Sequence, residues 1–353
     1  MKKLIPKKNI CFITETGKKD EKISDASVRY RCYHIAETLL LDGHFCSIYS
    51  SEQFFSNPNL DFDVYIFHRP TTKRSGFNRL IKSLKNLNKI LIADYDDLIF
   101  GDYQIYTKCA AVRNKNLSEE SAEIVFRSNL EALSEFTNVT TSTKMLSEYA
   151  KKYNSNANVS TVNNFIPQSL ISTYSNSILN IKKPKNDVIG YFSGSASHNF
   201  DLEMIADVLD RVLIENPNYG FMVVGPVQLS PKIKHLRNVK TLPLVPYQKL
   251  PSLMMLCSKI IAPLENNEFN QCKSRVKFLE SMLANCDLIS SPIQDMSDIK
   301  SKHLKLAKNK DEWYELLCRR SEYKPEQLFN KKNYQMLESM INLKSLNLIL
   351  DAV

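Results

Sequence analysis

The chain has 353 residues and a mass of 40.6 kDa, a length that predicts two domains, each able to bury a core without disulfides or structural metals. Hydrophobic residues make up 43% of the sequence and charged residues 24%, which excludes a disordered or fibrous chain. The 47 Lys and Arg exceed the 38 Asp and Glu by a formal charge of +9, which favours phosphate-bearing partners or an anionic surface.

The first half of the chain alternates short apolar runs with segments of helical period, the pattern of a parallel sheet covered by helices. Strands are predicted at residues 10–14, 45–49, 64–67, 90–93, 139–141 and 159–162. Helices are predicted at residues 27–41, 118–135 and 144–153. The strands are nearly continuous apolar runs, as expected for strands buried on both faces. Residues 1–167 are therefore predicted to form the first domain.

A second series of the same kind follows a polar segment. Residues 168–187, rich in Ser, Asn, Lys and Pro, are predicted to be an interdomain linker. Strands are then predicted at residues 188–192, 221–224, 260–262 and 288–290, with helices at 201–215 and 274–283. Residues 188–310 form the second predicted domain. Residues 311–353 have helical period and form a tail that packs on its own domain or crosses to the other.

The predicted fold class is α/β, with two doubly wound parallel sheets facing a cleft and a helical C-terminal tail. Ligands of such sheets bind beyond the carboxyl ends of the strands. We therefore look for functional residues directly after each predicted strand.

Cysteine usage and the lengths of the apolar runs indicate where the protein is located. The eight cysteines have no C-x-x-C spacing and most lie in apolar runs, which favours reduced thiols and a cytoplasmic location. The N-terminus lacks the apolar stretch of a signal peptide, and the longest apolar run, residues 253–264, is too short to span a bilayer. We expect a soluble protein that can still associate with a membrane.

Common catalytic motifs are absent. No Walker loop, G-x-G-x-x-G, G-x-S-x-G or H-E-x-x-H occurs, which argues against ATPases, dehydrogenases, α/β-hydrolases and zincins. Nucleic-acid binding is supported only by the net charge and scattered aromatic residues, so no nucleic-acid partner is expected.

The most informative stretch is PLENNEFNQCKSRVKFLESMLANC, residues 263–286, which runs from a strand through a polar loop into a helix beginning near Ser274. Free N–H groups at the helix start and the ammonium of Lys273 can hold a diphosphate. Glu280, about two turns further, can accept both hydroxyls of a ribose. The alternative is an ordinary amphipathic helix with a solvated Glu280, and spacing alone favours that alternative.

A second stretch, GYFSGSASHNFD at residues 190–201, forms a small polar turn after the first strand of the second domain. Gly194, between Ser193 and Ser195, lets the backbone approach a ligand, and His198 can donate to a phosphate oxygen. A plain strand-to-helix turn with an N-cap at Ser197 or Asn199 explains the same residues, and the two interpretations are compatible.

In the first domain, charged residues follow three strands. Arg29 lies at a predicted helix start, where it meets an anionic group or is simply solvated. His68 follows the third strand, and the carboxylates of DYDD follow the fourth. These carboxylates, Asp94, Asp96 and Asp97, can hold sugar hydroxyls, supply a base or cap a helix; metal binding is disfavoured because magnesium usually needs phosphates alongside.

The segment KRSGFNRLIKSLKNLNK, residues 73–89, is predicted to be a basic amphipathic helix. Its apolar residues recur at i, i+3, i+4 and i+7 and are surrounded by six Lys or Arg. Such a helix can lie on an anionic leaflet, although an ordinary packed helix has the same stripe, and we slightly favour ordinary packing.

These motifs, taken in order, resemble the GT-B glycosyltransferases of the "group 1" type that build bacterial capsule and O-antigen polysaccharides. The matching segments of the first domain are SVRYRCYHIAETLLLDGH, DYDDLIF and NNFIP. Those of the second are IGYFSGSASHNFDL, VPYQKLPSLM and IAPLENNEFNQCKSRVKFLE. The resemblance covers roughly residues 8–295 and implies two Rossmann-like domains, with the acceptor bound by the first and the donor by the second.

The resemblance implies transfer of a sugar from a nucleotide-sugar donor (a UDP-, GDP-, dTDP- or CMP-sugar) to a growing, lipid-linked surface glycan at the cytoplasmic face of an anionic membrane. We expect that no metal or other cofactor is required. Glu280 would hold the ribose, and Lys273 and Ser274 the diphosphate. The other donor-side residues would be Ser193, Gly194, Ser195, His198, Asn270, Pro246 and Tyr247. The residues facing the acceptor or the reacting carbon would be Arg29, His68, Asp96 and Asp97.

Two departures from the family pattern matter. Cys272 occupies the position eight residues before Glu280, where the wider family often has a second Glu. The glycine-rich loop after the first strand is replaced by ETGKKDEKISDAS, in which Asp25 can serve as an inverting base. Two alternatives stay open: a nucleotide-sugar epimerase or hydrolase of the same architecture, and a non-catalytic assembly subunit.

Overall fold

The computed structural model describes residues 7–18, 20–177, 187–194, 199–319 and 331–351. By its internal contacts the chain divides into two compact units. The first unit is Met1–Pro167 with Cys272–Ser274 and Ile341–Val353, and the second is Gln168–Gln271 with Arg275–Met340. Each unit is built on a six-stranded parallel sheet, which confirms the predicted α/β class and doubly wound sheets.

The sheet of the first unit has the order β2-β1-β3-β4-β5-β6. Its strands are β1 (Asn9–Thr14), β2 (Phe45–Ser50), β3 (Val64–His68), β4 (Ile90–Tyr95), β5 (Asn138–Thr141) and β6 (Asn158–Thr161). Its helices are η1 (Lys22–Ser24), α1 (Ala26–Val28), the π-helical turn η2 (Arg29–Tyr33), α2 (His34–Leu41), α3 (Ser51–Ser56), α4 (Phe77–Asn86), α5 (Tyr103–Tyr106), α6 (Ala110–Arg113), α7 (Glu119–Ser134), α8 (Lys144–Tyr153) and α18 (Lys344–Asp351). All six predicted strands of this unit lie within two residues of their expected bounds.

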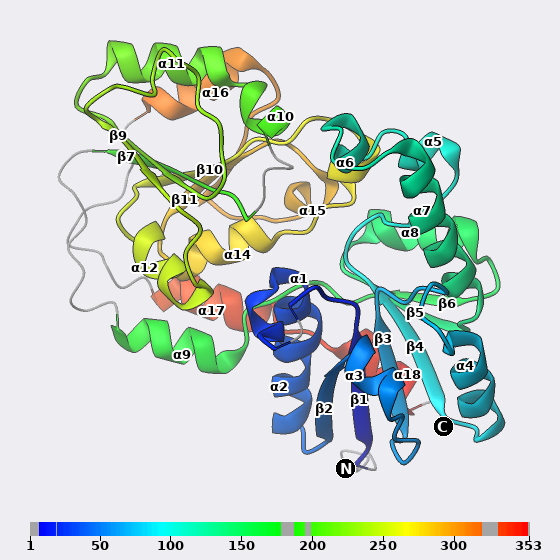
Figure 1. Cartoon of the computed structure of the whole chain (residues 1–353). Helices are drawn as coiled ribbons and strands as arrows, with labels where there is room; N and C mark the ends of the chain where they lie inside the picture. Colours follow the sequence, from blue (N-terminus) through cyan, green and yellow to red (C-terminus); the bar gives the residue numbers. More distant parts are fainter. Residues whose placement is uncertain (1–6, 19, 178–186, 195–198, 320–330, 352–353) are drawn as a thin grey trace. The chain divides into compact units, whose positions relative to one another are not determined.

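Helices cover both faces of the first sheet (Figure 1). Alternate residues of the central strands, such as Ile10 and Phe12, share one core with α2 and α18. On the other face Phe67 packs against Phe77 of α4 at 6.3 Å between ring centroids. The last helix of the tail, α18, therefore belongs to the first unit through Leu346 and its neighbours.

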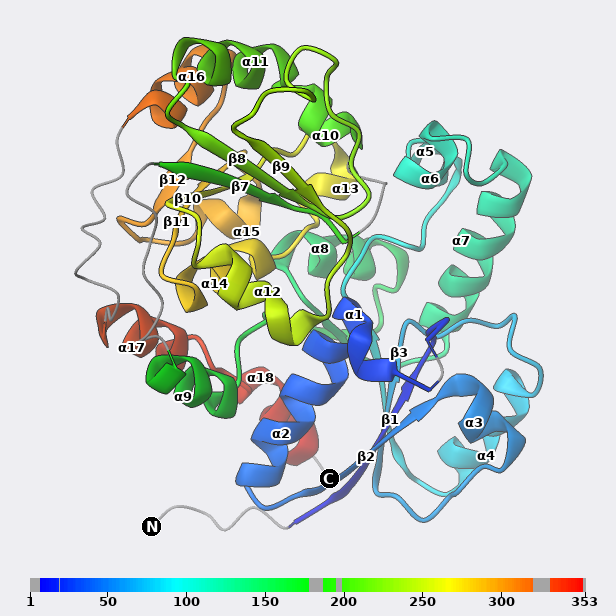
Figure 2. The same ribbon diagram turned by 60° about the vertical axis from the view of Figure 1, so that its left-hand side comes forward.

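The sheet of the second unit has the order β12-β11-β10-β7-β8-β9. Its strands are β7 (Val188–Phe192), β8 (Gly220–Val224), β9 (Val239–Leu242), β10 (Lys259–Ala262), β11 (Asp287–Ser290) and β12 (Leu304–Leu306). Its helices are α9 (Gln168–Ser177), α10 (Asn199–Glu203), α11 (Ala206–Glu215), η5 (Tyr247–Lys249), α12 (Leu250–Met254), α13 (Glu268–Gln271), α14 (Val276–Leu283), α15 (Gln294–Ser297), α16 (Lys310–Cys318) and α17 (Lys331–Ser339). Figure 2 shows α11 and α16 side by side on one face, where Trp313 fills the core.

The predicted linker is wrong over its first ten residues, because Gln168–Ser177 forms the helix α9. Ile171 and Tyr174, three residues apart, are buried, and α9 packs against α17 of the tail. The Tyr174 hydroxyl donates to the Gln248 carbonyl at 3.0 Å. This tertiary packing stabilises a helix in a polar sequence that carries no strong helical period of its own.

Candidate functional site

The strand order of the first sheet reverses between β1 and β3, and polar side chains gather where these strands end. Thr14 and His68 are their last residues, and both side chains are buried. Asp96 follows β4 directly. A reversal point of a parallel sheet opens a crevice beyond the strand ends, so this edge is the expected place for a ligand.

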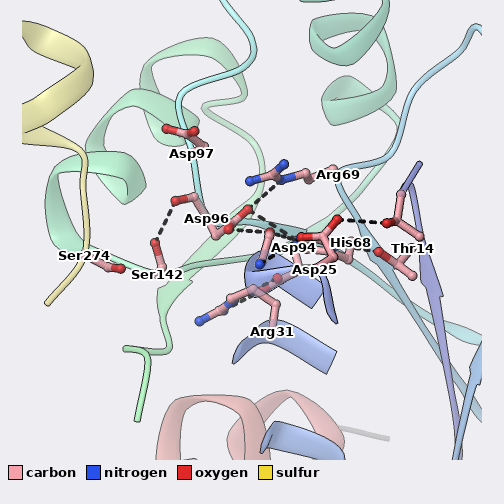
Figure 3. Close-up of polar contacts among 12 residues, drawn as sticks. Thr14, Asp25, Arg31, His68, Arg69, Asp94, Asp96, Asp97, Ser142 and Ser274 are labelled. Carbon is pink, nitrogen blue, oxygen red and sulfur yellow. Dashed lines mark hydrogen bonds and ion pairs between the residues drawn. The ribbon is translucent and has the colours of Figure 1, made fainter. Parts of the chain in front are cut away.

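His68 is the centre of a hydrogen-bond network at this edge (Figure 3). Its Nδ1 lies 2.8 Å from Oγ1 of Thr14, and its Nε2 lies 2.9 Å from Oγ of Ser27 and 3.3 Å from Asp96. Because the Ser27 hydroxyl donates its hydrogen to Asp96, Nε2 of His68 is the donor toward Ser27. In the neutral imidazole Nδ1 then accepts from Thr14.

Asp96 is held ionised by its partners. Burial alone would disfavour the charged carboxylate, but Arg69, with Nε at 2.7 Å, and His68 hold the pKa of Asp96 well below its usual value. A carboxylate with a lowered pKa and occupied oxygens is a weak base. Asp96 therefore suits orientation and charge stabilisation better than proton removal.

Asp94 has a structural role that the sequence pattern did not separate from that of its neighbours. Its carboxylate forms a bidentate pair with Arg31 at 2.6 and 3.0 Å and accepts a hydrogen bond from Thr140 at 2.7 Å. The remaining nitrogen of Arg31 donates to the Val162 carbonyl and to Asn164. Arg31 and Asp94 are both buried. Because Arg31 binds Asp94 on β4 and also Val162 and Asn164, it links β4 to the segment that follows β6.

Lys273 and Ser274, predicted to bind a diphosphate, belong to the first unit and are paired with other residues of that unit. The ammonium of Lys273 lies 3.1 Å from both oxygens of Asp97, and Ser274 accepts a hydrogen bond from Asn164 at 2.9 Å. Burial would lower the pKa of Lys273, but the charge of Asp97 outweighs it and raises the pKa. Lys273 is therefore cationic, and its partly exposed pair with Asp97 can exchange for an anionic ligand.

Arg29 and Asp25 both have local roles at the start of the first helix. Arg29 is buried rather than solvated: Nη1 donates to the Ile23 carbonyl at 2.9 Å, and the guanidinium lies 5.7 Å from the ring of Tyr30. Asp25 caps α1 by accepting from Ser27 N–H, and its other oxygen accepts from Thr16. The solvated alternative for Arg29 is wrong, and the role of Asp25 as a base stays a prediction.

In the second unit the strand order reverses between β7 and β10. Ser193 and Gly194 follow β7, Ser193 being buried and Gly194 exposed with open space around its α-carbon. Gly225, after β8, has φ of +112°, and a Cβ there would lie 1.9 Å from the Ser193 carbonyl oxygen. Only glycine lets these two loops approach so closely. The predicted residues Ser195 and His198 lie outside the described residues.

The polar loop after β10 is braced by Asp201 of α10. One oxygen of Asp201 accepts from the Glu265 backbone N–H and from the Asn270 amide, both at 2.9 Å. Asn270 also donates to the Glu265 carbonyl at 3.0 Å. The side chain of Asn270, predicted on the donor side, thus holds the two loops of this edge together, and a donor contact would be additional to that role.

Helix α14 begins at Val276, two residues later than expected. The backbone N–H of Arg275 donates to Asp295 at 2.7 Å, so one of the N–H groups expected to be free for a diphosphate is used. Glu280 is 5% exposed and its carboxylate accepts from Lys277 at 2.8 Å. The solvated alternative for Glu280 is therefore wrong, because the helix places this carboxylate inside.

Three other predicted features have mixed environments. Pro246 is exposed and Tyr247 half-buried at the start of η5. Cys272 is fully buried, and its carbonyl accepts from Thr143 at 3.1 Å. Within the described ranges, no group of three or more His, Cys, Asp or Glu is arranged to hold a metal ion.

The basic helix α4 buries its apolar stripe. Phe77, Leu80, Ile81 and Leu84 are at most 7% exposed, which confirms ordinary packing, while its Lys and Arg lie on the outer face. No helix in the part of the chain that the structure describes is both long and apolar enough to cross a membrane.

Sequence reasoning missed four residues of these edges: Thr14, Ser27, Arg69 and Asp201. Arg69 directly follows His68 in the segment HRP, and Ser27 follows Asp25 by two positions. The spacing gave a signal for the edges, because each of these residues lies next to or near a predicted strand end. The spacing did not indicate which side chains form hydrogen bonds with each other, because these pairs are up to 69 residues apart in sequence.

Comparison with known proteins gives the fold its name. No protein-family model matches the sequence, and no curated protein matches it significantly. A solved glycosyltransferase from Rickettsia africae superposes with a TM-score of 0.57 at 11% identity, over 98% of this chain and 96% of that one. A UDP-forming α,α-trehalose-phosphate synthase from Burkholderia xenovorans gives 0.54 at 10% identity, over 85% and 74%.

A third similar structure is TarM, with a TM-score of 0.50 at 12% identity over 82% of this chain. The chain spans 55% of the length of TarM. Likeness at these identities concerns the fold. The chain has the GT-B fold of these glycosyltransferases, as the motif resemblance predicted.

Proposed function

We propose that the chain is a glycosyltransferase that moves a sugar from a nucleotide-sugar donor to a growing, lipid-linked surface glycan of the capsule or O-antigen type. The observation that carries the proposal is the buried carboxylate of Glu280, about one turn into the helix that follows the loop after β10. Burial of a carboxylate is costly, and a fold that retains one beside a strand-order reversal is suited to a polar ligand there.

The proposed mechanism uses groups of the chain to stabilise a leaving diphosphate. Glu280 accepts the ribose hydroxyls of the donor, and Lys273 and the amino end of α14 face the diphosphate. As the sugar departs with oxocarbenium character, negative charge grows on the leaving oxygen, and these positive groups stabilise it. Such an arrangement needs no metal ion. The network of His68 and Asp96 then orients the acceptor.

The positive charge of the chain supports the proposal of a lipid-linked acceptor. The chain carries a formal charge of +9, and α4 presents exposed Lys and Arg while its apolar stripe is buried. A cationic surface is attracted to an anionic leaflet, where the proposed lipid-linked acceptor would lie. We infer a peripheral location on the cytoplasmic face of the membrane.

Binding of nucleotides to Glu280→Gln tests the donor site. Titration calorimetry with UDP, GDP, dTDP and CMP first identifies the base. For the ribonucleotide that binds, we expect Glu280→Gln to raise Kd by about ten- to hundredfold, because a charge-assisted hydrogen bond contributes about 1.5–3 kcal/mol. The control Glu315→Gln changes an exposed Glu of α16.

A 2′-deoxy analogue sharpens this test. The wild type should prefer the ribonucleotide, and the preference should disappear in Glu280→Gln. A preference that persists in the variant would show that another group reads the ribose. Sugar transfer is measured with labelled donor, with and without lipid-linked acceptor, and release of free or epimerised sugar without acceptor would contradict the proposal.

The burial of Cys272 favours a second candidate, a non-catalytic assembly subunit. The position where related enzymes often have a carboxylate here holds a fully buried thiol. Failure of all four nucleotides to bind would support this candidate over the transferase.

A further inference from the structure

Arg69 differs from the other arginines of the first unit in its backbone. It follows β3 with φ of +57°, in the left-handed region that residues other than glycine seldom adopt. Its backbone N–H donates to the Asp94 carbonyl at 2.8 Å. Left-handed conformations of such residues cost about 1–3 kcal/mol and concentrate at functional sites.

The side chain of Arg69 is clamped at one end. Nε donates to Asp96 at 2.7 Å (Figure 3). Asp96 in turn accepts hydrogen bonds from Ser27 and His68. His68 is itself held by Thr14 of β1. A chain of hydrogen bonds from the core strands therefore sets the direction of the guanidinium.

The other end of Arg69 has unused donors. To the described residues the structure records no hydrogen bond from its two amino groups, and the side chain is 28% exposed. By contrast, Arg31 uses all three nitrogens, and Arg74 uses Nε and Nη2 on Glu15. Asp96 accepts from Nε alone, so both amino groups of Arg69 remain available as donors.

Arg69 and Lys273 are paired with adjacent carboxylates, Arg69 with Asp96 and Lys273 with Asp97. The charge of Arg69 acts to lower the pKa of Lys273, against the stronger opposite effect of Asp97. Nearby carboxylates keep Arg69 charged: burial acts to lower the pKa of its guanidinium, but Asp96, Asp97 and Asp25 raise it further. Two cations held by adjacent carboxylates, one of them with amino groups that have no recorded partner among the described residues, suit a group that carries more than one negative charge.

We propose that Arg69 is a phosphate-binding residue, held in place by Asp96. The inference rests on the proposed function, in which the phosphate belongs to the diphosphate of the donor or to a phosphorylated acceptor. The planar guanidinium, fixed through Nε, presents its amino groups to phosphate oxygens in one geometry. A lysine at this position would keep the charge and lose that geometry.

Calorimetry on the full chain with sodium pyrophosphate and with methyl phosphate, at constant ionic strength, tests the proposal. We expect Arg69→Gln to raise Kd for one of the two probes by about ten- to hundredfold. Arg69→Lys should weaken the same probe by a smaller factor. The matched control Arg74→Gln breaks an ion pair just after the same strand and should stay within about twofold of the wild type, as for a partly exposed pair.

The probe that responds identifies the source of the phosphate. Loss of pyrophosphate binding assigns Arg69 to the donor diphosphate, and loss of methyl phosphate binding alone assigns it to a phosphorylated acceptor. Wild-type affinity of both Arg69 variants for both probes, or a wild type that binds neither probe, overturns the proposal. If circular dichroism shows that Arg69→Gln does not fold, the affinity of Arg69→Lys for the two probes decides the test.

The outcomes separate this inference from the proposed function. A chain that transfers sugar while Arg69→Gln binds both probes normally contradicts only the role of Arg69. A chain with phosphate binding that depends on Arg69, and with no sugar transfer to any acceptor, contradicts only the transferase.

Discussion

Replacement of Arg31 by Met should destabilise the first unit by about 3–5 kcal/mol, the usual cost of leaving one partner of a buried ion pair behind. The side chains of Arg31 and Asp94 are 0% and 2% exposed, and the pair is bidentate at 2.6 and 3.0 Å. After the substitution the carboxylate of Asp94 would keep only Thr140 as a hydrogen-bond partner among the contacts described above. The Val162 carbonyl and Asn164 would also lose a donor.

Urea unfolding followed by two signals measures this effect. Trp313 is the single tryptophan and is buried in the second unit, so its fluorescence reports that unit, whereas far-ultraviolet circular dichroism reports both. We expect Arg31→Met to lower the midpoint of the circular dichroism transition and leave the fluorescence transition unchanged. The control Arg74→Met, which breaks the partly exposed pair with Glu15, should cost about 1 kcal/mol or less.

The double variant Arg31→Met, Asp94→Leu completes the cycle. The double variant removes both charges. Its loss of unfolding free energy should therefore be smaller than the summed losses of the two single variants by about 2 kcal/mol or more. The reasoning is refuted if Arg31→Met costs no more than Arg74→Met, since the buried carboxylate would then be satisfied by other means.

Two further predictions concern acid stability and membrane binding. Burial lowers the pKa of His34 to about 4 from 6.5, so the unfolded chain binds the proton more readily and stability falls as pH drops from 6.5 toward 4. We expect His34 to contribute about 3 kcal/mol of that loss. The urea midpoints at pH 7 and pH 4.5 should therefore differ less in His34→Gln than in the wild type. For α4, Arg79→Gln with Lys82→Gln should weaken co-sedimentation with vesicles containing phosphatidylglycerol, and salt should abolish the wild-type binding. Equal binding to neutral vesicles would contradict an electrostatic contact.

The central strands of both sheets could be predicted from the sequence because they are buried on both faces. A run such as that of β1 is apolar throughout, and its ends are marked by polar residues. The missed strands, β9 and β12, are the edges of the second sheet. Both are short and partly exposed, so their residues mix Lys with apolar side chains and carry no clear period.

The candidate site was predictable in its position and not in its contacts. Residues directly after strands meet at one edge of a parallel sheet, and this geometry located His68, Asp96 and Ser193. The partners depend on three-dimensional packing: Arg31 and Asp94 are 63 residues apart. The burial of Glu280 likewise depends on what α14 packs against, which a helical period on a single chain segment does not specify.

The segment DYDD shows how burial divides roles among similar side chains. The exposed fraction of the carboxylates rises from 2% at Asp94 to 12% at Asp96 and 28% at Asp97, and each is paired with a different cation. A buried pair cannot exchange a partner for a ligand without leaving a charge unpaired in the interior, so Asp94 is confined to structure. The pair of Asp97 and Lys273 is partly exposed and can separate at little cost, as the proposed binding of a phosphate requires. Asp96 lies between these limits: it is buried enough to hold its partners in place, while Arg69 is exposed enough to contact the proposed phosphate.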